Sequence, residues 1–181
     1  RRMYGENSEN IYYYITVYNE PYMHPAEPEN LDVAGLLKGI YLYSPAGNQR
    51  KKCAQILASG VGVNWALKAQ KLLRDDWGVE ASVWSVTSWN ELRRDGLQTD
   101  HHNLLNPSDK RRAYISQKLD GSNGPVIAVS DYMRAVQDQI LPWIQSPFIS
   151  LGTDGFGLSD TRGALRRHFK VDAESIAIAT L

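Results

Sequence analysis

The chain has 181 residues, of which 43% are hydrophobic, and its 20 basic residues balance its 20 acidic ones. This length and composition suit one domain, or one domain with an extension, and provide enough apolar residues for a buried core. The zero net charge argues against a nucleic-acid-binding protein, and no run approaches the roughly 18 apolar residues that a membrane span needs.

The first thirty residues differ from the rest of the chain. The stretch "NIYYYITVYNEPY" favours a strand, and the proline-dense "PYMHPAEPEN" that follows favours an extended linker. We therefore interpret 1–30 as the last strand and linker of a preceding domain, and 31–181 as a separate domain. Because the chain has no initiator methionine and ends inside the apolar "ESIAIATL", we expect it to be a fragment of a longer polypeptide.

After the linker, short apolar segments alternate with helical ones. Strands are expected at 39–44, 53–60, 80–88, 124–131 and 148–152. Helices are expected at 63–78, 90–95, 132–144 with an interruption at Pro142, 162–169 and from a capping Asp172 onward. This alternation predicts an α/β fold in which an open, mostly parallel sheet lies between two layers of helices, a three-layer sandwich.

In such a sheet, the loops at the carboxyl ends of the strands form the natural site. Those loops are expected to begin near Ser59-Gly60, Thr87-Ser88, Ser130-Asp131 and Thr153-Asp154. The first of them carries Gly60 and Gly62, but a dinucleotide-binding fingerprint would need a third glycine where Trp65 stands. The amides of this turn could still attract an anion, so Gly60, Gly62 and Asn64 form a possible anion site.

The chain offers no other recognisable chemical site. Cys53 is the only cysteine, so it cannot form an internal disulfide, and we interpret it as a buried, reduced thiol of a cytoplasmic protein. The adjacent His101 and His102 point in different directions on a helix and seldom bind one metal ion. The sequence therefore predicts no catalytic residue, no cofactor-binding residue and no metal ligand.

The glycine-rich stretch "LGTDGFGLSD" at 151–160 lacks the lysine of a phosphate-binding loop. Its glycines permit unusual backbone angles, Phe156 between two of them suits insertion into a neighbouring surface, and Ser159 or Asp160 can cap the next helix. We interpret the stretch as a structured interface loop. The candidate residues are Thr153, Asp154, Gly155, Phe156, Gly157, Ser159, Asp160 and Arg162.

The segment "LGTDGFGLSDTRGALRRHFKVD" resembles the end of the homodimeric-type pyruvate dehydrogenase components, thiamine-diphosphate enzymes related to transketolase. "YYYITVYNEPY", "VWSVTSWNELRRDG", "NLLNP" and "VSDYMRA" resemble further blocks of that family, so the likeness covers nearly the whole chain. One position departs from the pattern: Leu158 stands where the family usually has a basic residue.

The resemblance implies that 31–181 is the carboxy-terminal domain of a three-domain subunit, with a fold similar to that of transketolase, and that 1–30 ends the pyrimidine-binding domain. It implies thiamine diphosphate and magnesium in the full enzyme, neither in this fragment, and catalytic residues upstream of Arg1. The implied partners are a second subunit of a homodimer and the dihydrolipoyl acetyltransferase component. A different hypothesis stays open, that of a regulatory module binding small ligands or anions at the strand-end loops.

Overall fold

The computed structural model describes residues 1–15, 17, 21–47, 53–122 and 124–181. Its centre is a five-stranded sheet with the strand order β1-β3-β2-β4-β5. The strands are β1 (Ile40–Ser44), β2 (Cys53–Ala58), β3 (Glu80–Val86), β4 (Val126–Val129) and β5 (Phe148–Leu151). All five lie within the segments that the sequence predicts as strands.

The sheet is parallel except at one edge. β2 pairs in parallel with β3 and β4, and β4 with β5, whereas β1 runs antiparallel to β3 with an irregularity between Leu42 and Ser44. All residues of β2 and β4 are buried. The predicted mostly parallel sheet is therefore confirmed, and β2 and β4 are buried along their whole length because helices cover both of their faces.

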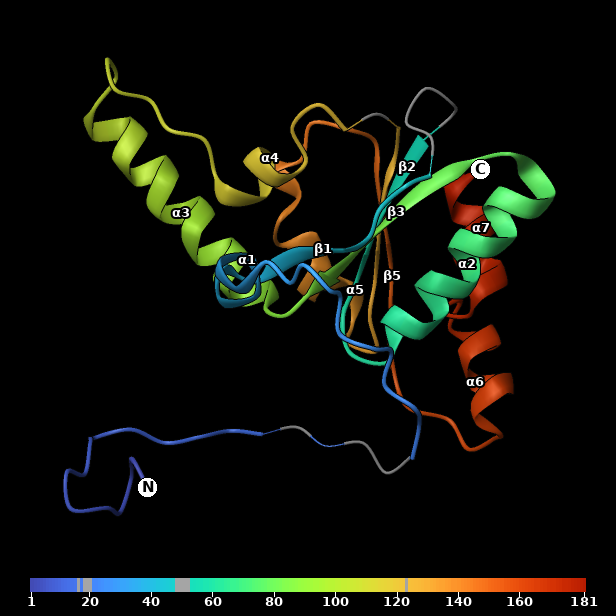
Figure 1. Cartoon of the computed structure of the whole chain (residues 1–181), viewed down its shortest axis with the longest axis horizontal. Coiled ribbons are helices and arrows are strands. Elements are labelled where there is room, and N and C mark those ends of the chain that lie inside the picture. The colour runs from blue at the N-terminus through green and yellow to red at the C-terminus, as the bar shows by residue number, and fades with distance from the viewer. Residues whose placement is uncertain (16, 18–20, 48–52, 123) are drawn as a thin grey trace.

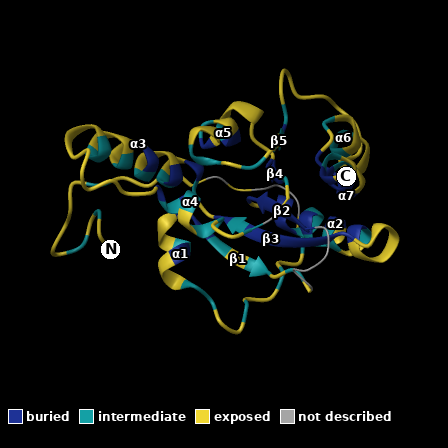
Figure 2. Ribbon diagram, turned by 90° about the horizontal axis from the view of Figure 1, so that it is seen from above, coloured by how far each residue is buried: buried dark blue, intermediate teal, exposed yellow. Residues whose placement is uncertain are grey.

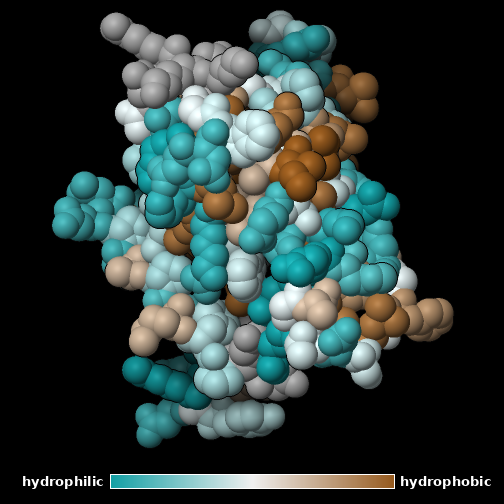
Figure 3. Space-filling view, turned by 90° about the vertical axis from the view of Figure 1, so that its right-hand side faces the viewer, coloured by the Kyte–Doolittle hydropathy of each residue, from teal (hydrophilic) through white to brown (hydrophobic). Residues whose placement is uncertain are grey.

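Two helical layers enclose the sheet (Figures 1 and 2). One layer contains α2 (Gly62–Trp77), α6 (Arg162–His168) and α7 (Ala173–Thr180), and the other contains α3 (Trp89–Leu105), α4 (Tyr114–Lys118) and α5 (Arg134–Asp138). Each layer buries its own apolar core against the sheet, one with Leu73 and Ile176 and the other with Leu92 and Ile115. The outer surface on the α2–α6–α7 side is largely hydrophilic, with separate hydrophobic patches (Figure 3).

The predicted short helix at 90–95 is wrong in length, because α3 continues through Gly96 to Leu105. Gly96 is buried, and a Cβ atom there would lie 2.5 Å from Cδ2 and Cζ2 of Trp143. The missing side chain thus makes room for an indole ring rather than ending the helix. The N-terminus of α3 is capped by Ser88, whose side chain accepts a hydrogen bond of 3.1 Å from the amide of Glu91.

The predicted helix 132–144 also differs, because α5 already ends at Asp138 and a 3-10 turn, η1, covers Leu141–Trp143. A proline ring clashes with the carbonyl four residues earlier, which for Pro142 is that of Asp138. Two short helices were not predicted, α1 (Val33–Lys38) and α4. An ion pair of 2.6 Å joins them, from Lys118 of α4 to Asp32, the N-cap of α1.

The strand predicted in the first thirty residues is absent from residues 11–15 and 17; the rest of "ITVYNE" lies outside the described residues. Tyr12, Tyr14 and Val17 are exposed. A strand needs a neighbour for its backbone hydrogen bonds, and this segment has none beside it in the described part of the chain. None of the helices described for this chain is long and apolar enough to cross a membrane.

Candidate functional site

The carboxyl edge of the sheet contains the point where the chain changes direction. After β2 the chain enters α2 on one face of the sheet, and after the adjacent β4 it enters α5 on the other face. The loops that begin at Ser59 and Ser130 therefore diverge, which is the arrangement that opens a crevice in sheets of this kind.

A cleft of about 740 Å³ lies at this edge. Three of the four predicted strand-end loops line it, through Ser59-Gly60, Thr87-Ser88 and Asp131. The proline-rich linker also contributes, through Tyr22 and His24. The linker is held at the sheet by the hydroxyl of Tyr43, which donates a hydrogen bond of 2.5 Å to the carbonyl of Ala26.

The cleft is aromatic and hydroxyl-rich rather than basic. Indole Nε1 of Trp89 donates a hydrogen bond of 3.1 Å to Oγ of Ser59, so this buried hydroxyl is already engaged. Among the described residues that line the cleft there is no lysine or arginine, and Asp131 adds a carboxylate. An anion here would have backbone dipoles but no lysine or arginine from the described lining beside it.

The residues of the possible anion site do not act as one unit. Gly60 lines the cleft with a φ of 57°, in the left-handed region that favours glycine. Gly62 is buried at the start of α2, where a Cβ atom would lie 3.4 Å from the carbonyl of Val129. Asn64 is half-buried in α2 and does not line the cleft.

The fourth predicted loop, the glycine-rich loop at 152–160, lies beside the cleft and is fixed at its base. The amide of Thr153 donates a hydrogen bond of 2.9 Å to the carbonyl of Tyr132. Asp154 accepts two hydrogen bonds from Arg134, 2.9 Å from its amide and 2.6 Å from its Nε. This guanidinium holds the pKa of the Asp154 carboxyl below its usual range.

Gln137 also stabilises the base of the glycine-rich loop. It was not singled out from the sequence. Its side chain is fully buried. Its Nε2 donates a hydrogen bond of 3.1 Å to Oγ of Ser130 and one of 3.0 Å to the carbonyl of Leu151. It therefore ties together the ends of β4 and β5, from which the two neighbouring loops leave. The sequence around it, Arg-Ala-Val-Gln-Asp, carries no local signal that could have identified it.

The tip of the glycine-rich loop projects outward. Gly155 has a φ of 82°, and Phe156 is 94% exposed. Gly157 has open space around it, and Arg162 begins α6. An aromatic side chain of this size is often buried, so the exposed ring keeps the tip a candidate for the interface that the sequence predicts.

The expected cap at Ser159 or Asp160 is wrong, because the helix begins later. Thr161 is the N-cap of α6, and its side chain accepts a hydrogen bond of 3.3 Å from the amide of Ala164. Asp160 instead accepts 2.6 Å from the amide of Thr161. The other expected cap is confirmed, since Asp172 is the N-cap of α7 and its side chain accepts a hydrogen bond of 3.1 Å from the amide of Ser175.

The described residues contain no group of three or more His, Cys, Asp or Glu side chains that could hold a metal ion. The carboxylate of Asp154, in the glycine-rich loop, already forms an ion pair with Arg134. His102 contacts the carbonyl of Asp109 at 2.9 Å rather than sharing a ligand with His101. The donors present here do not fit a magnesium diphosphate, which needs several oxygen ligands held together.

The Asp154–Arg134 pair gives a pH-dependent prediction. Because the folded-state pKa of Asp154 is lowered, its stabilising effect is fully present above the ordinary value of 3.8 and is lost as the pH falls through the lower folded-state value. Asp154→Asn should therefore unfold more easily than the parent protein at pH 7, and the difference should shrink below about pH 4. Urea unfolding at several pH values measures it.

The matched control is Asp76→Asn, an exposed carboxylate with no ion pair to any described residue. Its stability difference should be small and nearly constant with pH. Equal effects of the two substitutions across the pH range would contradict the conclusion that the ion pair between Asp154 and Arg134 stabilises the fold.

A family model, the transketolase-like TK C-terminal domain, matches residues 39–172. The chain belongs to this family. The match begins at the C-cap of α1 and ends at the N-cap of α7, so it covers the whole sheet of this transketolase-like C-terminal domain.

Curated relatives match the domain along its entire length. It is 57% identical over 182 residues to the pyruvate dehydrogenase E1 component of Mycolicibacterium smegmatis and 55% identical over 181 residues to that of Mycobacterium tuberculosis. It is 42% identical to the Escherichia coli K12 protein of the same name. These matches cover 99–100% of the chain but 20% of each relative, so the chain spans about a fifth of their length.

Solved structures of transketolases have the same fold. A Pichia stipitis transketolase superposes with a TM-score of 0.55 at 22% identity, covering 86% of this chain and 19% of that one. The Leishmania mexicana transketolase gives 0.53 at 18% identity, covering 84% and 19%. At these identities the likeness concerns the fold alone.

Proposed function

We propose that this chain is the carboxy-terminal domain of a pyruvate dehydrogenase E1 component, an enzyme that decarboxylates pyruvate and passes the acetyl unit to lipoyl groups of a dihydrolipoyl acetyltransferase. The observation that carries the proposal is the identity of 51–57% to three E1 components over 99–100% of the chain. We place the whole enzyme in the cytoplasm, as a homodimer that uses thiamine diphosphate and magnesium.

Within that enzyme, this domain serves assembly rather than chemistry. The cleft at the carboxyl edge has no lysine or arginine among its described lining, and the glycine-rich loop uses the ion pair between Asp154 and Arg134 to fix its own base. What the loop offers to the outside is Phe156 and the half-exposed Leu158. We propose that this tip docks on the second subunit.

The segment 1–30 belongs, in this proposal, to the pyrimidine-binding domain and its linker. Its tyrosine-rich residues have strand propensity and are exposed here, as expected of a strand whose sheet lies elsewhere. The alternative of a regulatory module that binds anions at Gly60, Gly62 and Asn64 gains no support from the comparisons.

A direct test concerns activity. The 181-residue chain should neither bind thiamine diphosphate with magnesium nor release carbon dioxide from pyruvate, because its described residues supply no oxygen-ligand cluster for the metal. The full-length polypeptide should do both. Calorimetric titration and a carbon dioxide assay on the two proteins make the comparison.

Micromolar cofactor binding by the 181-residue chain would contradict the assignment of the active site to other domains. A full-length polypeptide that binds the cofactor but does not act on pyruvate would instead contradict the proposed substrate.

A further inference from the structure

Helix α3 projects away from the sheet, and its outer surface has no partner among the described elements (Figure 1). A shallow groove of about 650 Å³ runs along this surface and is lined by α3 and the residue after it, from Asn90 to Asn106. The groove is therefore a feature of a single helix surface and not a gap between two elements.

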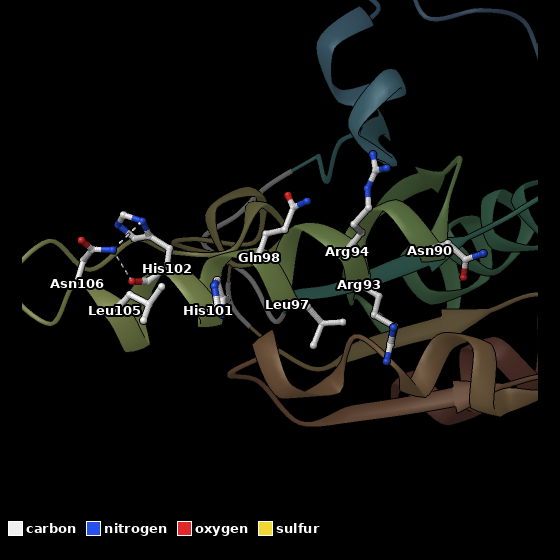
Figure 4. Close-up of a pocket in the computed structure, with 9 residues that line it drawn as sticks. All are labelled: Asn90, Arg93, Arg94, Leu97, Gln98, His101, His102, Leu105 and Asn106. Carbon is white, nitrogen blue, oxygen red and sulfur yellow. Dashed lines mark hydrogen bonds between the residues drawn. The ribbon is translucent and has the colours of Figure 1, made fainter. Parts of the chain in front are cut away.

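The lining residues form two parallel rows with a spacing of four. One row consists of Arg93, Leu97, His101 and Leu105, and the other runs from Asn90 through Arg94, Gln98 and His102 to Asn106. Figure 4 shows Arg93 and Leu97 pointing to one side of the helix and Arg94 and Gln98 to the other. Rows spaced by four are the ridges of an α-helix, and the channel between two of them receives the ridge of a second helix.

The side chains that line the groove determine what kind of helix could bind in it. Leu97 is 45% and Leu105 is 64% exposed, so the row that contains them offers apolar surface to an occupant. Neither of the aspartates of α3 reaches this surface. Asp95 accepts a hydrogen bond of 2.5 Å from the amide of Tyr114, and Asp100 accepts one of 3.0 Å from Nε1 of Trp143.

Because both aspartates bond to groups away from the groove, arginines are the charged side chains that line it. Arg94 pairs with Glu91 at the groove's edge, whereas Arg93 has no ion pair with any described residue. No acidic residue lines the groove in the described part of the chain. An occupant with carboxylates beside an apolar ridge would be complementary in both shape and charge.

We propose that this groove receives an amphipathic, acidic α-helix from the part of the same polypeptide that lies outside these 181 residues. The inference rests on the proposed function. The curated E1 relatives have about four-fifths of their length outside the matched region. The N-terminal segment leaves the domain towards the side to which α3 projects, in both views (Figures 1 and 2), so chain preceding it has access to the groove.

Photo-cross-linking of the full-length polypeptide tests this. A benzophenone amino acid replaces Leu97 in one variant and, as a control, the exposed Lys71 of α2 in another. After irradiation, the variant at 97 should give a cross-link within one polypeptide, to a peptide that carries apolar and acidic residues at helical spacing. Arg93→Glu should lower the yield of that cross-link, and Arg93→Lys should retain it.

A cross-linked dimer of the polypeptide would show that a second copy fills the groove, and a cross-link to another component would show a separate partner; either overturns the proposal. A yield at 97 no higher than at 71 would show that the groove faces solvent and would overturn it as well. Because the readout is a cross-link, its failure is distinguishable from failure of the proposed activity, which pyruvate turnover reports separately.

Discussion

Gly96→Ala should destabilise the protein by up to about 2 kcal/mol, although alanine is the better helix former. In an open helical position the substitution gains about 1 kcal/mol from helix propensity. At Gly96 the new Cβ atom would lie 2.5 Å from two ring atoms of Trp143, and overpacking of this kind costs about 1–3 kcal/mol.

The indole of Trp143 cannot move aside easily. Its Nε1 donates a hydrogen bond of 3.0 Å to Asp100. The backbone carbonyl of Trp143 accepts a further hydrogen bond of 2.7 Å from Oγ of Ser116. A displaced ring would break the first and strain the second, so the steric cost should exceed the gain in propensity.

Gly163→Ala is the matched control, because Gly163 lies in α6 with no atom within 4 Å of the added Cβ position. There only the propensity gain remains, and stability should rise by up to about 1 kcal/mol. Denaturant unfolding of the two variants should therefore shift the midpoint in opposite directions. A stabilised Gly96→Ala protein would mean that Trp143 does not pack on this helix.

Phe156→Ala should weaken association of the full-length polypeptide while leaving the stability of this domain nearly unchanged. The side chain is 94% exposed, so its removal takes little from the core. If the ring inserts into a second subunit, it has the character of an interface hot spot, where truncation costs about 2 kcal/mol or more, roughly a 30-fold rise in the dissociation constant.

Sedimentation at several concentrations measures the dissociation constant, and thermal unfolding of the domain measures the second part of the prediction. Trp77→Ala is the control, since Trp77 is an aromatic residue, 62% exposed, on α2 rather than on the glycine-rich loop. Unchanged association together with lost turnover at saturating cofactor would contradict the docking role of Phe156.

The middle of the sheet could be predicted from the sequence because β2 and β4 are short, mostly apolar runs that are buried on both faces. "CAQILA" and "VIAV" have no polar alternation to suggest another structure. The helices were harder, since their ends depend on contacts between distant residues. Gly96 resembles a helix end until Trp143, far along the chain, is placed against it.

The candidate site was predictable in position but not in detail. The carboxyl ends of parallel strands share one edge, and three of the four predicted loops do line one cleft. No local pattern, however, shows that Asp154 pairs with Arg134, or that Gln137 joins the ends of β4 and β5. Both contacts form between segments that only the tertiary fold brings together.

The strand order has a consequence for how the chain folds. The connection between β2 and β3 comprises only residues 59–79 and is largely α2 itself, so this unit can close early at a small cost in loop entropy. β4 pairs with the other side of β2 only after residues 59–125 have been enclosed. Until β4 docks, that edge of β2 has no strand beside it, and we expect pairing with another molecule to compete with the docking of β4.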